Sequence, residues 1–349
     1  MPDYETYDLG DFTLQSGEVI PSAKIAYKTF GDPSLPAIIY PTWYSGLISD
    51  NEWLISPSKT LSPSTYFIII PALFGNSESS SPSNTSLDPF PKVTFYDNVA
   101  AQYALVTKHL HITHAFAVLG WSMGAAQTYQ WATQYPDFMD RIAPFCGSAK
   151  TSLHNQVFLE GVKGALVAAK GAASAGVCKG YTCQHKTARE WTQEERVNGL
   201  KALGRVYAGW GFSQAFYREK LFETALGYKD LETFMTDFWE TWSLSKHPEN
   251  MLTMLHTWQC GDVSSQPPYN NDFPAAMKAI KAKALVLPSK TDLYFPPEDS
   301  EYEVQCMKDG IGRLEVFPSI WGHWAGGPGQ SVQDVKWLDE KLREFFAEE

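Results

Sequence analysis

"AFAVLGWSMGAAQTYQWATQY", residues 115–135, is the stretch that decides the fold. Its first five residues form an apolar run typical of a strand buried on both faces, and apolar residues recur at helical spacing from Met123 onward. Between the two patterns, residues 120–124 read G-x-S-x-G. At a sharp strand-to-helix turn the central serine takes a strained backbone conformation, and larger side chains at the flanking glycines would collide with the neighbouring strand and helix. We therefore predict that Ser122 is a nucleophile at the start of a helix, where backbone N–H groups and the helix dipole favour a developing oxyanion.

Strand and helix patterns alternate on both sides of this stretch. Short apolar runs with few charges occupy residues 37–40, 66–70, 141–146, 284–288 and 313–317. Amphipathic segments of helical length cover residues 96–110, 123–135, 298–308 and 332–346. Before them, the alternation between residues 12 and 30 predicts a pair of strands. Strands that alternate with helices imply right-handed crossovers, so we predict an α/β fold with a mostly parallel sheet flanked by helices.

The alternation breaks between Thr151 and about Lys281, where the sequence is helix-like and rich in aromatic residues, as in "FMTDFWETWSL". We expect residues 151–281 to form a helical lid inserted into a core domain made of residues 1–150 and 282–349. Open α/β sheets bind ligands at the carboxyl ends of their strands, so the lid is expected to cover that edge.

A serine hydroxyl needs a general base, and the base needs a carboxylate to orient it. After a serine elbow of this kind, the carboxylate comes first in the chain and the histidine second, each following a late strand. Asp292 follows "ALVLPSKT" and His323 follows "RLEVFPSIWG", whereas the other seven histidines have no late strand before them. Asp292 alone also suits a helix cap before "PPEDSEYEV". Order and spacing together favour a triad of Ser122, Asp292 and His323.

The oxyanion formed by attack of the serine requires two N–H donors. The first is expected from Met123, directly after the nucleophile. The second is expected from the loop "PTWYSG", residues 41–46, where Thr42 or Trp43 would supply it.

Composition excludes several classes of partner. The chain carries 28 Lys and Arg against 39 Asp and Glu, a net charge of −11 without a basic cluster, which argues against nucleic-acid or anionic-membrane binding. No stretch approaches the length of a membrane span and the first residues lack a leader pattern, so we expect a cytoplasmic protein. Five cysteines without framework spacing favour reduced thiols. Their densest group, "CKGYTCQH" (178–185), lacks a fourth ligand, and no metal is expected.

One longer stretch carries a family resemblance. "FPKVTFYDNVAAQYALVTKHLHITHAFAVLGWSMGAAQTYQWATQYPD", residues 90–137, is similar to F-P-x-V-T-x-x-D-x-V-x-x-Q followed by G-G-S-M-G-G-M-Q-x-x-x-W-A and Y-P-D, the pattern of the homoserine O-acetyltransferase family of the α/β-hydrolase superfamily. "TDLYFPPED" and "GHWAGG" resemble the segments around that family's triad aspartate and histidine. The resemblance covers nearly the whole chain and implies an α/β-hydrolase fold, acyl-enzyme chemistry and the same triad. The matching residues are Phe90, Pro91, Val93, Thr94, Asp97, Val99, Gln102, Ser122, Met123, Gly124, Gln127, Trp131 and Ala132.

The departures from this family concern the substrate. Family transferases follow the histidine with an aspartate that holds the amino group of homoserine, but this chain has Trp324, which offers cation–π contact in place of a carboxylate. The family's H-A-L-T-G loop is replaced by "PTWYSG", with Trp43 at the oxyanion position. By alignment with the family's carboxylate-binding arginine, Arg205 in "ALGRVY" is expected to bind substrate, together with Trp121 and Trp324.

We therefore expect a serine-dependent enzyme that hydrolyses a carboxylic ester or thioester through a Ser122 acyl-enzyme and needs no cofactor. One alternative is an O-acyltransferase that uses acetyl-CoA or another acyl-CoA as donor and homoserine or another alcohol as acceptor. A second, of a different class, is a non-catalytic ligand-binding protein on the same fold, against which the complete triad argues. Lyase chemistry stays open, as does a homodimer. The expected partner is a small-molecule ester or thioester.

Overall fold

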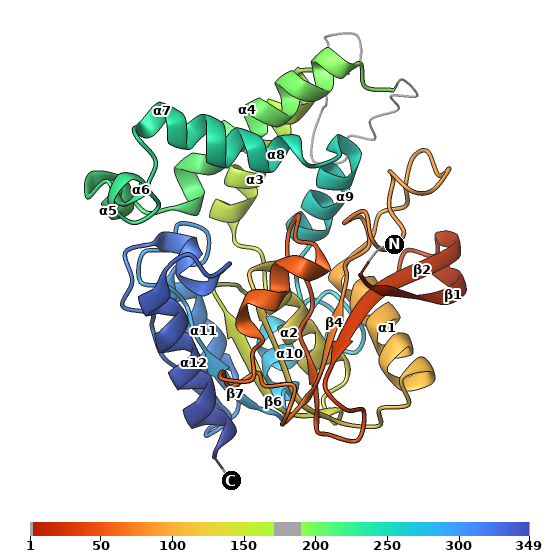
Figure 1. Ribbon diagram of the computed structural model, residues 1–349. Coiled ribbons are helices and arrows are strands. Elements are labelled where there is room, and N and C mark those ends of the chain that lie inside the picture. The colour runs from red at the N-terminus through yellow and green to blue at the C-terminus, as the bar shows by residue number, and fades with distance from the viewer. Residues whose placement is uncertain (1–2, 171–189, 349) are drawn as a thin grey trace.

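The computed structural model describes residues 3–170 and 190–348, so the "CKGYTCQH" stretch lies outside the described residues (Figure 1). The centre of the fold is an eight-stranded sheet in the order β1-β2-β4-β3-β5-β6-β7-β8. The pairs β1–β2 and β2–β4 are antiparallel, and all other neighbours are parallel, as predicted. The strands are β1 (Glu5–Thr13), β2 (Val19–Phe30), β3 (Ala37–Ile39), β4 (Phe67–Pro71), β5 (Ala115–Trp121), β6 (Met139–Phe145), β7 (Lys283–Val286) and β8 (Gly312–Leu314).

The strands β3, β4 and β5 are apolar throughout because both of their faces are buried. Along β4, Ile68 and Ile70 belong to one hydrophobic cluster, whereas Phe67 and Ile69 belong to another. Successive side chains of a strand point to opposite faces, so the two clusters are the packing layers above and below the sheet. All five residues of β4 are buried.

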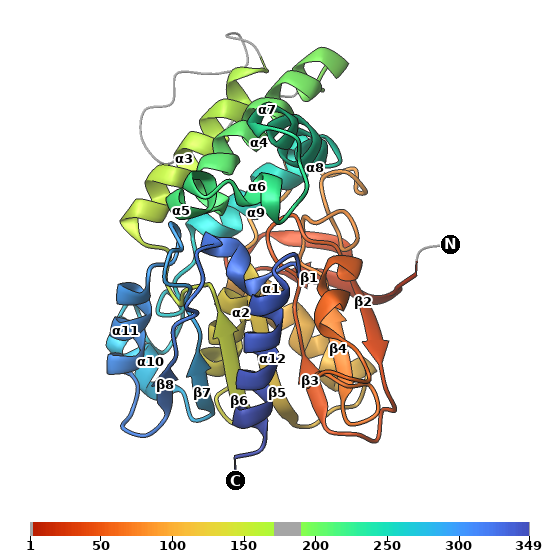
Figure 2. The same cartoon turned by 60° about the vertical axis from the view of Figure 1, so that its left-hand side comes forward.

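Helices cover both faces of the sheet and complete three layers (Figure 2). On one face α1, α2, α10 and α11 pack beside one another, and on the other α12 buries Leu338 and Leu342. The loop after β3 contains one further short helix, η1, and α1 continues into a π-helical turn, η2. Their bounds are η1 (Ile48–Leu54), α1 (Phe95–Ala104), η2 (Leu105–His109), α2 (Met123–Gln134), α10 (Phe273–Ala279), α11 (Pro297–Cys306) and α12 (Val332–Phe346).

The insertion between β6 and β7 forms a helical layer above one end of the sheet, which we call the lid (Figures 1 and 2). Its described helices are α3 (Leu153–Ala168), α4 (Gln193–Gly211), α5 (Gln214–Arg218), α6 (Leu221–Thr224), α7 (Leu231–Phe234), η3 (Met235–Glu240), α8 (Thr241–Leu244) and α9 (Pro248–Gln259). Helix α10, which the expected 151–281 insertion included, packs instead on α2 and α11 of the core. Its Phe273, Ala276 and Met277 lie in the same cluster as Val286 of β7, so the helices of the lid end at Gln259.

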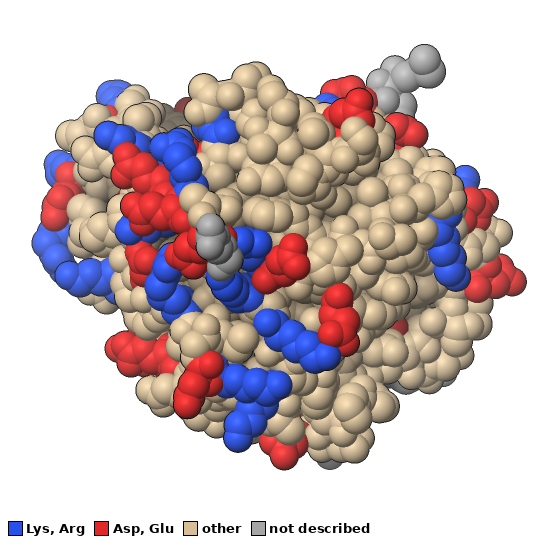
Figure 3. All heavy atoms as spheres, turned by 90° about the horizontal axis from the view of Figure 1, so that it is seen from below, with Lys and Arg blue, Asp and Glu red and all other residues tan. Residues whose placement is uncertain are grey.

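Charged side chains of both signs are mixed on the face opposite the lid, which Figure 3 shows from below. Pairs such as Arg313 with Glu315 and Lys341 with Glu344 lie within hydrogen-bond distance of each other. Within the described ranges, no helix combines the length and the apolar character needed to cross a bilayer.

Candidate active site

Ser122 occupies a tight turn between β5 and α2. Its backbone has φ 58° and ψ −123°, a region that residues other than glycine rarely adopt. A Cβ atom on Gly120 would lie 2.4 Å from the Gly124 carbonyl carbon, and one on Gly124 would lie 2.8 Å from the Pro41 carbonyl oxygen. Both glycines of the motif are therefore required by close backbone approach. The Ser122 N–H donates to the Phe145 carbonyl at 3.1 Å, which fixes the turn to β6.

The structure brings the three residues of the expected triad together. His323 Nε2 lies 2.9 Å from Ser122 Oγ, and its Nδ1 lies 2.7 Å from Asp292 Oδ2. Asp292 follows β7, and His323 is in the short helix η4 (Gly322–Gly326) in the loop after β8. All three residues are buried, with exposed fractions of 5% or less. The arrangement allows His323 to take a proton from Ser122 while Asp292 holds the imidazole in one tautomer.

Backbone donors and aromatic rings hold Asp292 and His323 in place. Asp292 Oδ1 accepts the N–H groups of Tyr294 at 2.8 Å and Phe295 at 3.2 Å. The helix-cap role that the sequence also allowed is wrong, because Pro296 is the N-cap residue of α11 and that helix has no side-chain cap. The Tyr294 ring meets the imidazole edge-on with centroids 4.7 Å apart, and Trp121 stacks on it at the same separation. Burial raises the pKa of Tyr294 well above its usual range, so this wall of the site is uncharged. Neither Tyr294 nor Phe295 was predicted from the sequence as a site residue, although both lie within three residues of Asp292.

The loop 41–46 supplies one available N–H beside the nucleophile's helix. The Thr42 N–H is already used, because it donates to Pro71 O at 3.1 Å. The Trp43 N–H, in contrast, has no hydrogen-bond acceptor in the described part of the chain. Met123 is the first residue of α2, so its N–H has no acceptor within the helix. Of the two residues considered for the second oxyanion donor, only Trp43 has its N–H free.

Aromatic side chains of the lid close the site from above. Trp324, next to His323, is 7% exposed and packs on Trp239 with ring centroids 5.1 Å apart and on Phe212 at 4.9 Å. Tyr44 of the loop 41–46 stacks on Tyr207 of α4 with an interplanar angle of 2°. The residue at the position expected for an amino-binding carboxylate is therefore part of a continuous apolar cover.

Arg205 does not join this site. Its side chain is 41% exposed, and the guanidinium pairs with Glu240 Oε1 and Glu232 Oε1, each at 2.6 Å. Both carboxylates belong to the lid, and they raise the pKa of Arg205 further above its usual range. The expected role in substrate binding is therefore not supported, because the helix face of α4 that carries Arg205 points to solvent.

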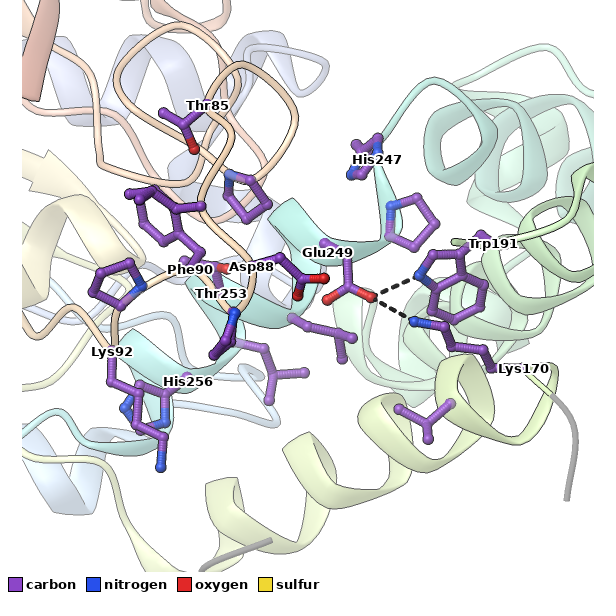
Figure 4. A pocket seen from close by; sticks show the side chains of 18 of the residues that line it. Thr85, Asp88, Phe90, Lys92, Lys170, Trp191, His247, Glu249, Thr253 and His256 are labelled. Atoms are coloured by element: carbon purple, nitrogen blue, oxygen red, sulfur yellow. Dashed lines mark hydrogen bonds and ion pairs between the residues drawn. The ribbon is translucent and has the colours of Figure 1, made fainter. Parts of the chain in front are cut away.

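A separate cavity of about 620 Å³ lies between the lid and the loop 82–93 (Figure 4). Glu249 of α9 lies inside it and accepts from Lys170 Nζ at 3.1 Å and Trp191 Nε1 at 2.7 Å. Ser122, Asp292 and His323 are not among the residues that line it. These three residues therefore lie outside this cavity, and all three are buried. Within residues 3–170 and 190–348, no three His, Cys, Asp or Glu side chains gather as a metal site would need.

The elbow serine after β5 is hydrogen-bonded to a histidine from the loop after β8, and this histidine is hydrogen-bonded to an aspartate from the loop after β7. This is the arrangement found in α/β hydrolases. Residues 48–164 match the model of the α/β hydrolase fold family. The chain is 34% identical to a probable esterase of Corynebacterium glutamicum and 33% identical to an ethyl acetate hydrolase of Pseudomonas veronii. The two alignments cover 98% and 99% of this chain and 95% of each relative. The chain belongs to the α/β hydrolase family.

Solved structures and more distant relatives show which members of this family the chain resembles. An acetylester hydrolase from Corynebacterium glutamicum has a TM-score of 0.87 at 33% identity, and 99% of this chain and 96% of that one are covered. An acetyl esterase has a TM-score of 0.89 at 31% identity, with 99% and 97% covered. A homoserine O-acetyltransferase of Methanococcoides burtonii is 24% identical over 92% of this chain and 69% of its own length. The chain is thus a divergent relative of the homoserine O-acetyltransferases, and its more similar relatives are esterases.

Proposed function

We propose that the protein is a serine esterase that hydrolyses small carboxylic esters, acetyl esters foremost, through an acyl-enzyme on Ser122. The observation that carries the proposal is the hydrogen-bonded line from Asp292 through His323 to Ser122, enclosed by an apolar cover that includes Trp324. The names of the relatives, an ethyl acetate hydrolase and acetyl ester hydrolases, support the acetyl group. Trp324 supports an alcohol part without an ammonium group, because an indole in an apolar cluster cannot replace a carboxylate partner.

In the acylation half-reaction, His323 Nε2 takes the proton of Ser122 as Oγ attacks the ester carbonyl carbon. The negative charge that develops on the carbonyl oxygen is stabilised by the N–H groups of Met123 and Trp43. When the intermediate collapses, the carbon–oxygen bond to the alcohol breaks, and His323 returns the proton to the leaving alcohol. Water then attacks the acyl-enzyme with His323 again acting as base, which releases the acid and restores Ser122.

Hydrolysis of ethyl acetate, followed by acid release at constant pH, tests the proposal. The wild-type protein is expected to turn over, and Ser122→Ala is expected to reduce turnover to the background rate and abolish labelling by a fluorophosphonate. Ser148→Ala is the matched control, because Ser148 is also buried near the sheet edge and its Oγ donates to Lys150 O. Equal labelling of Ser122→Ala and wild type would refute Ser122 as the nucleophile.

A second candidate, acyl transfer to an alcohol, is favoured by one observation: Ser122 is only 3% exposed, so bulk water does not reach it freely. Thiol release from acetyl-CoA with and without homoserine separates the two functions. Release that requires homoserine would establish a transferase, whereas ester hydrolysis that homoserine does not change supports the esterase.

The cytoplasm is the proposed location. The three described cysteines, Cys146, Cys260 and Cys306, are free thiols, which suits a reducing compartment. Size-exclusion chromatography with light scattering tests whether the protein forms the homodimer that the sequence leaves open.

A further inference from the structure

Two buried amide side chains donate hydrogen bonds to the backbone of the segment that leads to Trp43. Gln127 of α2 donates from Nε2 to the Thr42 carbonyl oxygen at 2.8 Å and to Met123 O at 3.0 Å. Asn51 of η1 donates from Nδ2 to the two preceding carbonyls, Tyr40 O at 3.0 Å and Pro41 O at 3.1 Å. Three consecutive carbonyl groups of the loop are therefore fixed by two side chains, neither of which contacts Ser122 Oγ.

The bond to Thr42 O has a consequence for the next residue. Thr42 C=O and Trp43 N–H belong to the same peptide unit, which is planar and trans. In such a unit the C=O and N–H point in opposite directions, so a donor that fixes the carbonyl also fixes the direction of the N–H. If the carbonyl were released, this peptide could rotate and change the direction of the Trp43 N–H.

Gln127 is itself oriented by two further residues. Gln102 of α1 donates from Nε2 to Gln127 Oε1 at 2.6 Å, and Trp131 donates from Nε1 to Gln102 Oε1 at 2.8 Å. An indole nitrogen can only donate, so Gln102 must present its oxygen to Trp131 and its NH₂ group to Gln127. Gln127 must then present its oxygen to Gln102 and its NH₂ group to Thr42. The polarity of the whole chain of bonds follows from Trp131.

Because the residues in this chain of hydrogen bonds are buried, losing or reversing one of the bonds is costly. Thr42, Gln102, Gln127 and Trp131 are all 0% exposed. Water cannot replace a missing partner easily at such a position, and an amide turned the wrong way would bring two donors together. The four residues come from the loop after β3 and from helices α1 and α2. The hydrogen bonds therefore connect α2, which begins directly after Ser122, to the loop that carries Trp43.

We infer that Gln127 is a positioning residue for the oxyanion site, which orients the Trp43 N–H through the Thr42 carbonyl and is itself oriented by Gln102 and Trp131. The inference rests on the proposed esterase function, because only a reaction that passes through an oxyanion uses this N–H. A role limited to packing would change stability without changing turnover.

The test compares Gln127→Met with Gln130→Met. Methionine keeps the approximate volume but cannot donate. Gln130 is the matched control, because it is also buried in α2 and its Nε2 bonds Gln134 and Gln266 instead of the loop. For Gln127→Met, kcat on p-nitrophenyl acetate is expected to fall roughly 10- to 100-fold, short of the loss of a whole donor, with KM within about threefold. The rate of fluorophosphonate labelling should fall in parallel, because the phosphonyl oxygen uses the same donors.

The control and a second variant complete the design. Gln130→Met is expected to keep kcat within about twofold at a similar loss of thermal stability. Trp131→Phe removes the first donor and should lower kcat roughly 3- to 10-fold, and it decides the question if Gln127→Met does not fold. A folded Gln127→Met protein with wild-type kcat and labelling would overturn the inference and leave the esterase standing. A wild-type protein that neither hydrolyses the ester nor is labelled would overturn both.

Discussion

The indole of Trp121 stacks on the imidazole of His323, with ring centroids 4.7 Å apart and planes inclined by 26°, and donates from Nε1 to the His323 carbonyl oxygen at 3.1 Å. Trp121, one residue before Ser122, thus holds both the ring and the backbone of His323. Trp121 is 2% exposed, and its stacking on the base is a contact that the expected substrate-binding role had not included.

Substitution of Trp121 separates these two contacts. Trp121→Phe keeps an aromatic face but loses the hydrogen bond, and we expect turnover of an acetyl ester to fall a few-fold. Trp121→Leu loses both, and we expect a fall of about 10-fold or more, because a small displacement of the base reduces the rate steeply. Steady-state kinetics on both variants test the order. Equal rates for the two variants would contradict a role for the stacked face.

Asp292→Asn should lower kcat by roughly 10³- to 10⁴-fold, because an amide cannot hold the imidazole in the required tautomer. Asp334→Asn is the control, since this carboxylate is also buried and near the site but accepts from Ser319 Oγ at 2.7 Å instead of from His323. Its kcat should stay within about threefold of wild type. Near-normal turnover of Asp292→Asn would mean that another group orients the base.

Trp324 is expected to limit the size of the alcohol part. Trp324→Ala would leave a cavity among Trp121, Trp239 and Phe212, and the Trp324 indole nitrogen has no hydrogen-bond partner among the described residues. We expect the free energy of unfolding to fall by about 3 kcal/mol and kcat/KM for butyl acetate to rise relative to ethyl acetate. Urea denaturation and competition between the two esters measure these effects. Trp337→Ala, which removes a half-buried indole packed on Phe317, should leave the ester preference unchanged.

Glu303 makes stability depend on pH. Its carboxyl group accepts from the Ala149 N–H at 2.6 Å and lies 2.8 Å from the Tyr129 hydroxyl, and burial raises its pKa from 4.5 to about 8. Between these two pH values the folded protein keeps a proton that the unfolded chain releases. The stability that Glu303 contributes is therefore full below about pH 4.5 and is lost as the pH rises towards 8.

Glu303→Gln removes this titration. We expect the difference in unfolding free energy between Glu303→Gln and wild type to move in favour of the variant as the pH rises from 5 to 8, with a slope of at most about 1.4 kcal/mol per pH unit. Urea midpoints at pH 5, 6.5 and 8 provide the measurement. Parallel stability curves for the two proteins would show that Glu303 is ionised in the folded state.

Local sequence patterns predicted the elements in which the same face is buried along the whole length. Helix α12 was expected at 332–346 and has these bounds, because one apolar face lies on the sheet along its whole length. The 96–110 segment became α1 and a π-helical turn, a change of hydrogen bonding that the spacing of apolar residues does not record. The expected lid segment includes α10 because this helix, like the lid helices, has no strand directly before it; its packing on α2 and α11 is what distinguishes it from them.

The same contrast holds at the site. Ser122, Asp292 and His323 could be predicted because strained turns and strand ends leave a trace in neighbouring glycines and apolar runs. Arg205 could not be placed, because the direction of one side chain on an amphipathic helix depends on its partners, here Glu232 and Glu240. Gln102 and Gln127 match a family pattern, but the role of a buried amide cannot be predicted until its hydrogen-bond acceptor is known.

The hydrogen bond between Ser122 and His323 joins positions 201 residues apart, and the lid lies in the chain between them. Closing so long a segment of chain costs conformational entropy, and contacts between residues far apart in the sequence slow folding. We therefore expect recovered activity after dilution from denaturant to lag behind the return of helical signal.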